Sequence, residues 1–240
     1  VSKWVYKKAD ILIYSSKRFQ GYLKEVHNIT VPDEHYMPQF ADEVFEEALP
    51  TRESKPEKQL VFAGNIGKVQ AVEVLIEAAA ILRDEPVHWH IVGEGSNYES
   101  CMELAKSLDL DEKITFYGRK PLSDMPIYYG MADAMLVSMK NDLSVNDTLP
   151  GKVQSYMAAG KPILGSIAGE TPYVINKAQC GLCAPPDDPE AFAEVVRQFL
   201  AVQDADGMGE RGKAYYTQHF TKQKHMDKLE KMLFELAGGK

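Results

Sequence analysis

The sequence is poor in cysteine and has no long apolar segment. Its three cysteines, Cys101, Cys180 and Cys183, are too few for a disulfide framework and fit a reducing compartment. No apolar run approaches the ~20 residues that span a bilayer, and no signal-peptide pattern is found. We therefore expect a cytoplasmic protein that folds around its own hydrophobic core.

Positive charge is also in short supply. The chain has 27 lysines and arginines against 35 aspartates and glutamates, which gives a net charge of -8. Nonspecific nucleic-acid binding needs a basic surface to neutralise phosphates, so nucleic acid is not an expected partner. A local cationic pocket for one anionic ligand is still compatible with this composition.

Short apolar strands alternate with helical segments through the middle of the chain. We expect strands near residues 60–64, 88–93, 114–118, 134–138, 162–166 and 181–184, and helices near residues 71–82, 98–108, 124–131, 152–159, 171–177 and 189–202. This alternation predicts an α/β, Rossmann-like fold, with a parallel sheet covered by helices on both faces. Ligands of such sheets bind at the carboxyl ends of the strands.

The two ends of the chain have a different pattern. Residues 1–30 indicate a helix, a strand at residues 11–14 and a second helix, and residues 31–58 contain four prolines, which favours a linker. We expect the sheet domain to cover residues 59–205 and C-terminal helices to cover residues 206–240, with one long helix over residues 213–236. The chain begins with Val1, and we expect it to be part of a longer protein.

A glycine-rich turn follows the first strand of the expected sheet. Gly64 and Gly67 let the backbone approach a ligand, Asn65 lies between them, and Lys68 adds a positive charge near a helix start. This combination suits a phosphate group. The alternative is an ordinary turn with a solvated lysine, because neither a Walker loop nor a three-glycine dinucleotide motif is present.

A second candidate is the polar loop and helix start from residue 141 to residue 161. Thr148, Leu149 and Gly151 can present backbone N–H groups to a diphosphate, with Lys152 nearby. A capped surface helix is the alternative, although the loop is long for a simple connection. The turn at Gly118 and Arg119 is a third, weaker candidate.

Metal and redox chemistry are not expected. His88 and His90 share one face of a strand but have no convincing third ligand. Cys180 and Cys183 have the spacing of a redox motif, but no helix start follows them to lower a thiol pKa. We expect neither a cofactor nor a metal.

The ordered series of motifs resembles the C-terminal domain of group 1, or glycogen-synthase-like, glycosyltransferases of the GT-B type. The matching segments are residues 62–68, 91–95, 116–119, 129–134, 155–163, 169–170 and 180–190, and the resemblance covers roughly residues 58–202. Residues 1–30 resemble the last helix and strand of the family's N-terminal domain. Residues 213–236 resemble the C-terminal helix that crosses back to that domain.

The resemblance implies a retaining transferase domain that binds a nucleotide diphosphate sugar, most simply a UDP-sugar, without metal. A sugar or lipid-linked acceptor would then be bound by an N-terminal domain that lies outside this chain, and the isolated chain would be inactive. The form of residues 149–156 resembles enzymes that build capsule, O-antigen or other surface polysaccharides on lipid carriers. This implies peripheral association of the full-length protein with the inner face of the membrane.

The chain departs from the family pattern at its binding residues. The family has two glutamates eight positions apart, and here Ser155 takes the second position and Asp147 falls near the first. Asn65 replaces the usual phosphate-binding arginine, which leaves Lys68 or Lys152 to bind the phosphate. We name no catalytic residue.

Two other functions remain open at this point. One is a non-catalytic, nucleotide-binding or regulatory module, although the first core strand lacks the acidic cluster of a receiver domain. The other is a sugar-nucleotide epimerase of the same fold, which would need buried acid and base residues that we do not find.

Overall fold

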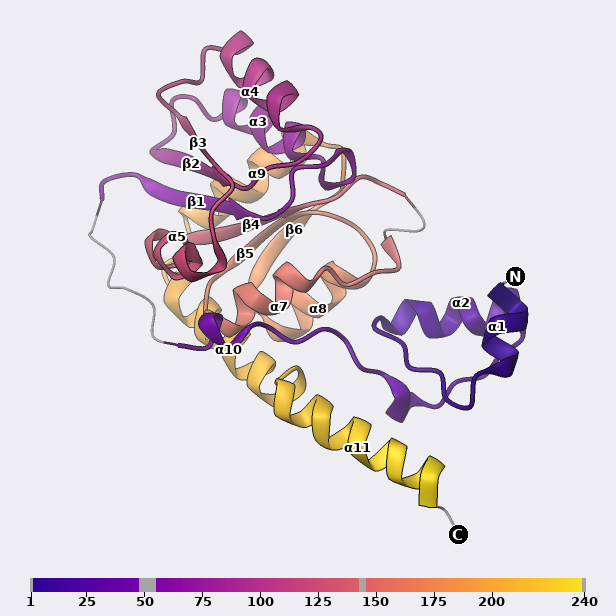
Figure 1. Ribbon diagram of the computed structural model, residues 1–240. Helices are drawn as coiled ribbons and strands as arrows, with labels where there is room; N and C mark the ends of the chain where they lie inside the picture. Colours follow the sequence, from indigo (N-terminus) through magenta and orange to yellow (C-terminus); the bar gives the residue numbers. More distant parts are fainter. Residues whose placement is uncertain (1, 48–54, 143–145, 239–240) are drawn as a thin grey trace.

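A computed structural model describes residues 2–47, 55–142 and 146–238 of the chain (Figure 1). Parts of the predicted linker (residues 48–54) and of the loop before residue 152 (residues 143–145) lie outside the described residues.

The centre of the molecule is a six-stranded parallel sheet with the order β3-β2-β1-β4-β5-β6. Its strands are β1 (Lys58–Ala63), β2 (Val87–Val92), β3 (Ile114–Gly118), β4 (Ala134–Ser138), β5 (Ile163–Ser166) and β6 (Gly181–Ala184). The predicted α/β fold with a Rossmann-like parallel sheet is confirmed, and each strand lies within two residues of its expected range.

Helices cover both faces of the sheet. One face packs on α3 (Val72–Ile81), α4 (Tyr98–Ser107) and α9 (Pro189–Leu200). The other packs on α5 (Met125–Met131), α7 (Gly151–Ala158), α8 (Glu170–Ala178) and α10 (Ala205–His219). Because side chains alternate along a strand, Leu60 and Phe62 of β1 belong to the first core and Val61 and Ala63 to the second. The strands are therefore apolar on both faces.

Short 3-10 turns connect several of these elements. They are η1 (Asp33–His35), η2 (Glu43–Phe45), η3 (Lys68–Gln70) and η4 (Leu122–Asp124). None of the helices in the described ranges is long and apolar enough to cross a membrane.

The N-terminal part forms a small unit beside the sheet domain (Figure 1). It contains α1 (Ser2–Lys8) and α2 (Lys17–His27), which share a small core around Tyr14, Leu23 and Val31. The prediction of a strand at residues 11–14 is wrong, because only Tyr14 forms an isolated bridge, with Tyr36. An extended segment that finds a single partner residue cannot build a ladder of hydrogen bonds.

The expected long C-terminal helix is divided in two. The helix α10 ends at His219 and α11 (Lys222–Gly238) follows, so the prediction of one helix over residues 213–236 is wrong. Phe220, which is 1% exposed, turns into the second core between them. Burying this ring requires the chain to leave the helical path. Beyond the break, α11 runs toward the N-terminal unit, where Lys228 Nζ donates to the Tyr36 carbonyl at 2.8 Å (Figure 1).

Candidate nucleotide-sugar site

The strand order reverses between β1 and β4, and a reversal of this kind forms a crevice at the edge of the sheet. The chain moves outward from β1 to β2 and β3, then returns to the other side of β1 for β4. Helices that leave the two strands in opposite directions open a crevice at their carboxyl ends. The backbone pairing of β1 with β4 ends at Phe62 and Leu136. Beyond these residues the two strands separate.

Tyr156 of α7 holds the strands where they separate. Its hydroxyl oxygen lies 3.3 Å from the Ala63 nitrogen, which donates to it, and 3.1 Å and 3.2 Å from the carbonyl oxygens of Ala63 and Leu136. Burial raises the pKa of this hydroxyl well above its usual range, so the group keeps the proton that it donates. The tyrosine therefore binds backbone groups that strand pairing no longer uses.

A cavity of about 470 Å³ opens at the carboxyl ends of β1, β2 and β3. Three of its lining residues, Gly64, Asn65 and Arg119, are predicted site residues. The others are Val92, Gly93, Glu94, Gly95, Lys120 and Met125. Glycine allows these loops to touch, because a Cβ on Gly93 would collide with the carbonyl oxygen of Gly64. The structure thus brings Gly64, Asn65 and Arg119 to one cavity, and Gly118 lies next to Arg119 at the end of β3.

The loop after β1 differs from the expected open helix start. The turn η3 follows Gly67, and α3 begins only at Val72. The Gly67 N–H donates to Gln70 Oε1 at 3.1 Å, and Asn65 Nδ2 donates to the same oxygen at 3.0 Å. The Gly67 N–H is therefore not free to bind a phosphate, contrary to the helix start expected in this turn. Sequence reasoning missed Gln70, although a glutamine three residues after a cap position is a known signal of this reciprocal bonding.

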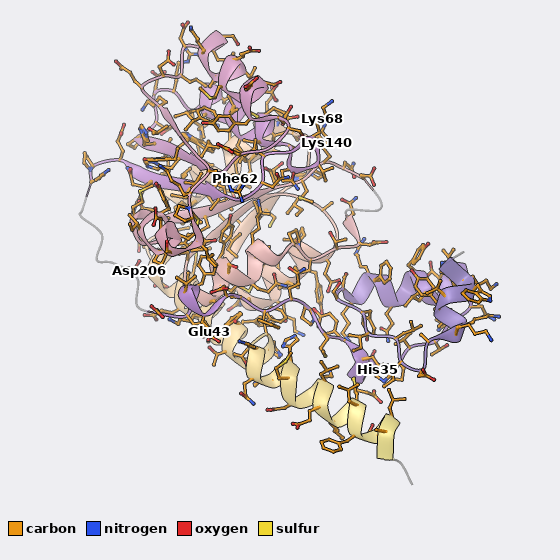
Figure 2. All side chains as sticks on the ribbon, in the orientation of Figure 1. His35, Glu43, Phe62, Lys68, Lys140 and Asp206 are labelled. Carbon is orange, nitrogen blue, oxygen red and sulfur yellow. The ribbon has the colours of Figure 1, made fainter. Side chains whose placement is uncertain are left out.

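Lys68 projects into solvent from the same loop (Figure 2). It is exposed, and within the described part of the chain its amine makes no hydrogen bond or ion pair. The neighbouring loop after β4 lies alongside, since the Lys140 N–H donates to the Val69 carbonyl at 2.9 Å. These contacts hold the two loops together without using the Lys68 side chain.

Lys152 has the opposite environment. Its Nζ is buried and has no hydrogen-bond partner among the described residues. The amine lies 3.8 Å from the centre of the Phe62 ring, and a Cβ on Gly64 would lie 3.0 Å from it. Burial lowers the pKa of Lys152 to about 7. The side chain thus reaches from the first turn of α7 to the end of β1, under the glycine that lines the cavity.

The remaining predicted residues lie on the α7 side of the crevice and have separate roles. Asp147 Oδ1 is 3.7 Å from Arg18 Nη1 of α2, and Thr148 is exposed. Leu149 is 6% exposed and belongs to the core. The Ser155 hydroxyl donates to the Gly151 carbonyl at 3.3 Å, so it is bonded to its own helix. None of the four lines the cavity at β1–β3.

The two strand histidines belong to a hydrogen-bonded patch on the sheet. His90 bonds Tyr117 at 2.8 Å and Gln59 at 2.9 Å, while His88 bonds Thr115 at 2.8 Å. Burial lowers the pKa of His90 to about 3, so the ring stays neutral. In the described ranges no group of three or more His, Cys, Asp or Glu residues could hold a metal ion.

Another cavity, of about 360 Å³, lies between the N-terminal unit and α8, α10 and α11. Its lining contains none of the predicted site residues. We take the strand-end cavity as the candidate site because it lies at the carboxyl edge beside the strand reversal, where sheets of this topology bind ligands.

Comparison with known proteins identifies the family of the chain. The family described as "Glycosyl transferases group 1" matches residues 45–215. The chain is 25% identical over 179 residues to the probable glycosyltransferase WbjE of Pseudomonas aeruginosa, covering 74% of this chain and 44% of that protein. It is 29% identical over 152 residues to the putative colanic acid biosynthesis glycosyl transferase WcaI of Escherichia coli, covering 60% of this chain and 35% of that protein.

Solved structures share the fold. A glycosyltransferase from Rickettsia africae superposes with a TM-score of 0.82 at 17% identity, covering 99% of this chain and 67% of the other. Anabaena HepE in complex with UDP and glucose superposes with a TM-score of 0.76 at 14% identity, covering 94% of this chain and 63% of the other. The predicted resemblance is confirmed by the family match and by these folds. The chain belongs to the glycosyl transferases group 1 family.

Proposed function

We propose that this chain is the donor-binding part of a retaining glycosyltransferase that uses a UDP-sugar. The observation that carries the proposal is the position of Gly64 at the strand reversal, where it lines the cavity and has the buried Lys152 amine beside it. HepE, which has the same fold, was solved with UDP and glucose. Family membership favours this function over a regulatory module or an epimerase.

The chain spans less than half the length of the curated relatives WbjE and WcaI. We therefore propose that the acceptor, a sugar or a lipid-linked sugar, binds to a part of the protein outside this chain. WcaI is named for colanic acid biosynthesis, which supports a role in surface polysaccharide synthesis. A lipid-linked acceptor would bring the full-length protein to the inner face of the membrane.

The transfer needs a group that stabilises the leaving diphosphate. When the bond between the anomeric carbon and the diphosphate oxygen breaks, negative charge develops on the leaving group. Preorganised cations and N–H groups in a site that excludes water stabilise such charge best. We propose that the Lys152 amine and the N-terminus of α7 supply this stabilisation. On this account the chain needs no metal ion.

Titration calorimetry with UDP, GDP and ADP tests the proposal directly. We expect UDP to bind to this chain with a Kd between micromolar and millimolar, because part of the nucleotide remains exposed to solvent. Uridine is the control and should bind more weakly, since it lacks the diphosphate. No binding of any of the three diphosphates at millimolar concentration would contradict the proposed function.

A further inference from the structure

We propose that Lys152 of α7, and not a residue of the glycine-rich loop, is the cation that binds the donor diphosphate, and that its amine takes up a proton as the diphosphate enters. This inference rests on the proposed function and adds to it the identity of the phosphate-binding residue. It also adds a proton to the binding reaction.

The Lys152 amine lies close to the candidate site. Lys152 Nζ is buried and lacks a hydrogen-bond partner among the described residues, which is a costly arrangement for an amine. It lies directly under Gly64, where even one added carbon would be 3.0 Å away. Gly64 itself is exposed and lines the cavity. A diphosphate that sits on Gly64 is therefore separated from the amine only by a residue without a side chain.

The loop after β1 has few groups left to bind a phosphate. The Gly67 N–H and the Asn65 amide both donate to Gln70, so these groups are already used. Lys68 is exposed and not held by any described contact. A flexible lysine in water loses side-chain entropy on binding and has its charge screened, whereas a buried lysine is held in place before the ligand arrives.

Among the described residues, the Lys152 amine has no acidic partner. Charged residues lie around this edge of the sheet, namely Lys68, Glu73, Glu94, Arg119, Lys120, Lys140, Asp147 and Glu170. None makes a hydrogen bond or ion pair with Lys152 in the described part of the chain. Three of the acids have other partners: Glu73 faces Lys140, Asp147 faces Arg18, and Glu170 accepts from the Lys17 N–H.

Burial explains how the amine can remain without a partner when the site is empty. Burial lowers its pKa to about 7, so at pH 8 the amine of the empty site is mostly neutral. A diphosphate nearby favours the charged form and raises the pKa again. Binding above neutral pH must then draw a proton from the buffer. A lysine that is already charged before the diphosphate binds would take up none.

The test is UDP calorimetry at pH 8 in two buffers that differ in ionisation enthalpy. UDP has already lost its last phosphate proton at this pH, because the pKa of that group is about 6. For the unmodified chain we expect the apparent enthalpy to depend on the buffer by close to one proton per UDP. Lys152→Met should weaken UDP binding at least about ten-fold, which is about 1.4 kcal/mol. It should also abolish the proton uptake and leave uridine binding unchanged.

Lys68→Met is the matched control, because it removes a lysine from the same edge and should keep both the affinity and the proton uptake. Lys161 is unsuitable as a control, since its amine donates to the carbonyls of Gly130 and Ala132. Circular dichroism checks that each variant folds. If Lys152→Met does not fold, the proton count of the unmodified chain decides alone.

Binding of UDP to the unmodified chain without proton uptake would overturn the inference and leave the proposed function intact. Unchanged affinity in a folded Lys152→Met variant would do the same. Failure of the unmodified chain to bind any nucleoside diphosphate would overturn both.

Discussion

At the scale of single residues, glycine and lysine shape the candidate site by opposite means. Gly93 has a φ of 138° and leaves room for the Gly64 carbonyl of the neighbouring loop. Lys152 fills the space below that loop with an amine that no described group neutralises. Glycine lets the two backbones come into contact, and lysine places an amine that can carry a charge beneath them.

Replacing Gly93 with alanine should destabilise the chain by at least about 2 kcal/mol, because the added carbon collides with backbone and the φ is unfavourable for an L-residue. Urea unfolding followed by circular dichroism measures the change. Gly21→Ala is the control: Gly21 lies in α2 with no atom within 4 Å of the added carbon. There alanine should stabilise by about 0.5–1 kcal/mol. Equal stability of Gly93→Ala and the unmodified chain would contradict the prediction.

The two cysteines of the apparent redox motif show how burial overrides spacing. Burial raises the pKa of Cys180 and of Cys183 to about 12. Their thiols therefore stay protonated and unreactive near neutral pH. The prediction that this pair is not a redox site rests on the flanking sequence, and the structure supplies a second, electrostatic reason for it.

At the scale of elements, α7 contacts β1 and β4 at the point where the two strands separate and the crevice begins. One hydroxyl, that of Tyr156, bonds backbone groups of both β1 and β4. Without it the Ala63 N–H and two carbonyl oxygens would be buried at a point where strand pairing has ended.

Tyr156→Phe should therefore cost about 1–3 kcal/mol of unfolding free energy, the usual cost of leaving a buried polar group without a partner. It should also weaken UDP binding, because β1 would no longer be held in register with β4 beneath Gly64. Urea unfolding and calorimetry give the two measurements. Tyr173→Phe, at a ring that is 58% exposed, should change neither. A Tyr156→Phe variant as stable as the unmodified chain would show that the hydroxyl contributes little.

At the scale of the whole molecule, the chain carries the donor side of the proposed reaction. It spans less than half of its curated relatives, and the N-terminal unit has only a small core of its own. The helix α11 leaves large apolar side chains in solvent, with Phe234 68% and Leu233 54% exposed.

We expect the isolated chain to bind UDP but to transfer no sugar, because the acceptor would not be held beside the anomeric carbon. The measurement is transfer of label from UDP-sugars to lipid-linked and free sugar acceptors, with the full-length protein assayed in parallel. Robust turnover by this chain alone would show that both substrates bind within residues 1–240.

The sequence by itself determined the parallel sheet and its alternation of strands and helices, and it led to the edge at which we propose that the ligand binds. These follow from local periodicity and from glycines at strand ends, which short windows of sequence contain. Local patterns failed at residues 11–14 and at Phe220. There the outcome depended on whether a partner strand was available and on where one ring could be buried.

Only the tertiary structure distinguished the two candidate lysines. Lys68 and Lys152 each follow a glycine near an expected helix start, so their sequence surroundings predict the same role. Packing of α7 against the end of β1, some ninety residues earlier in the chain, buries one amine under Gly64 and leaves the other in water. Such a contact depends on the relative position of elements that are distant in sequence. The desolvation that sets the charge of Lys152 arises from that packing alone.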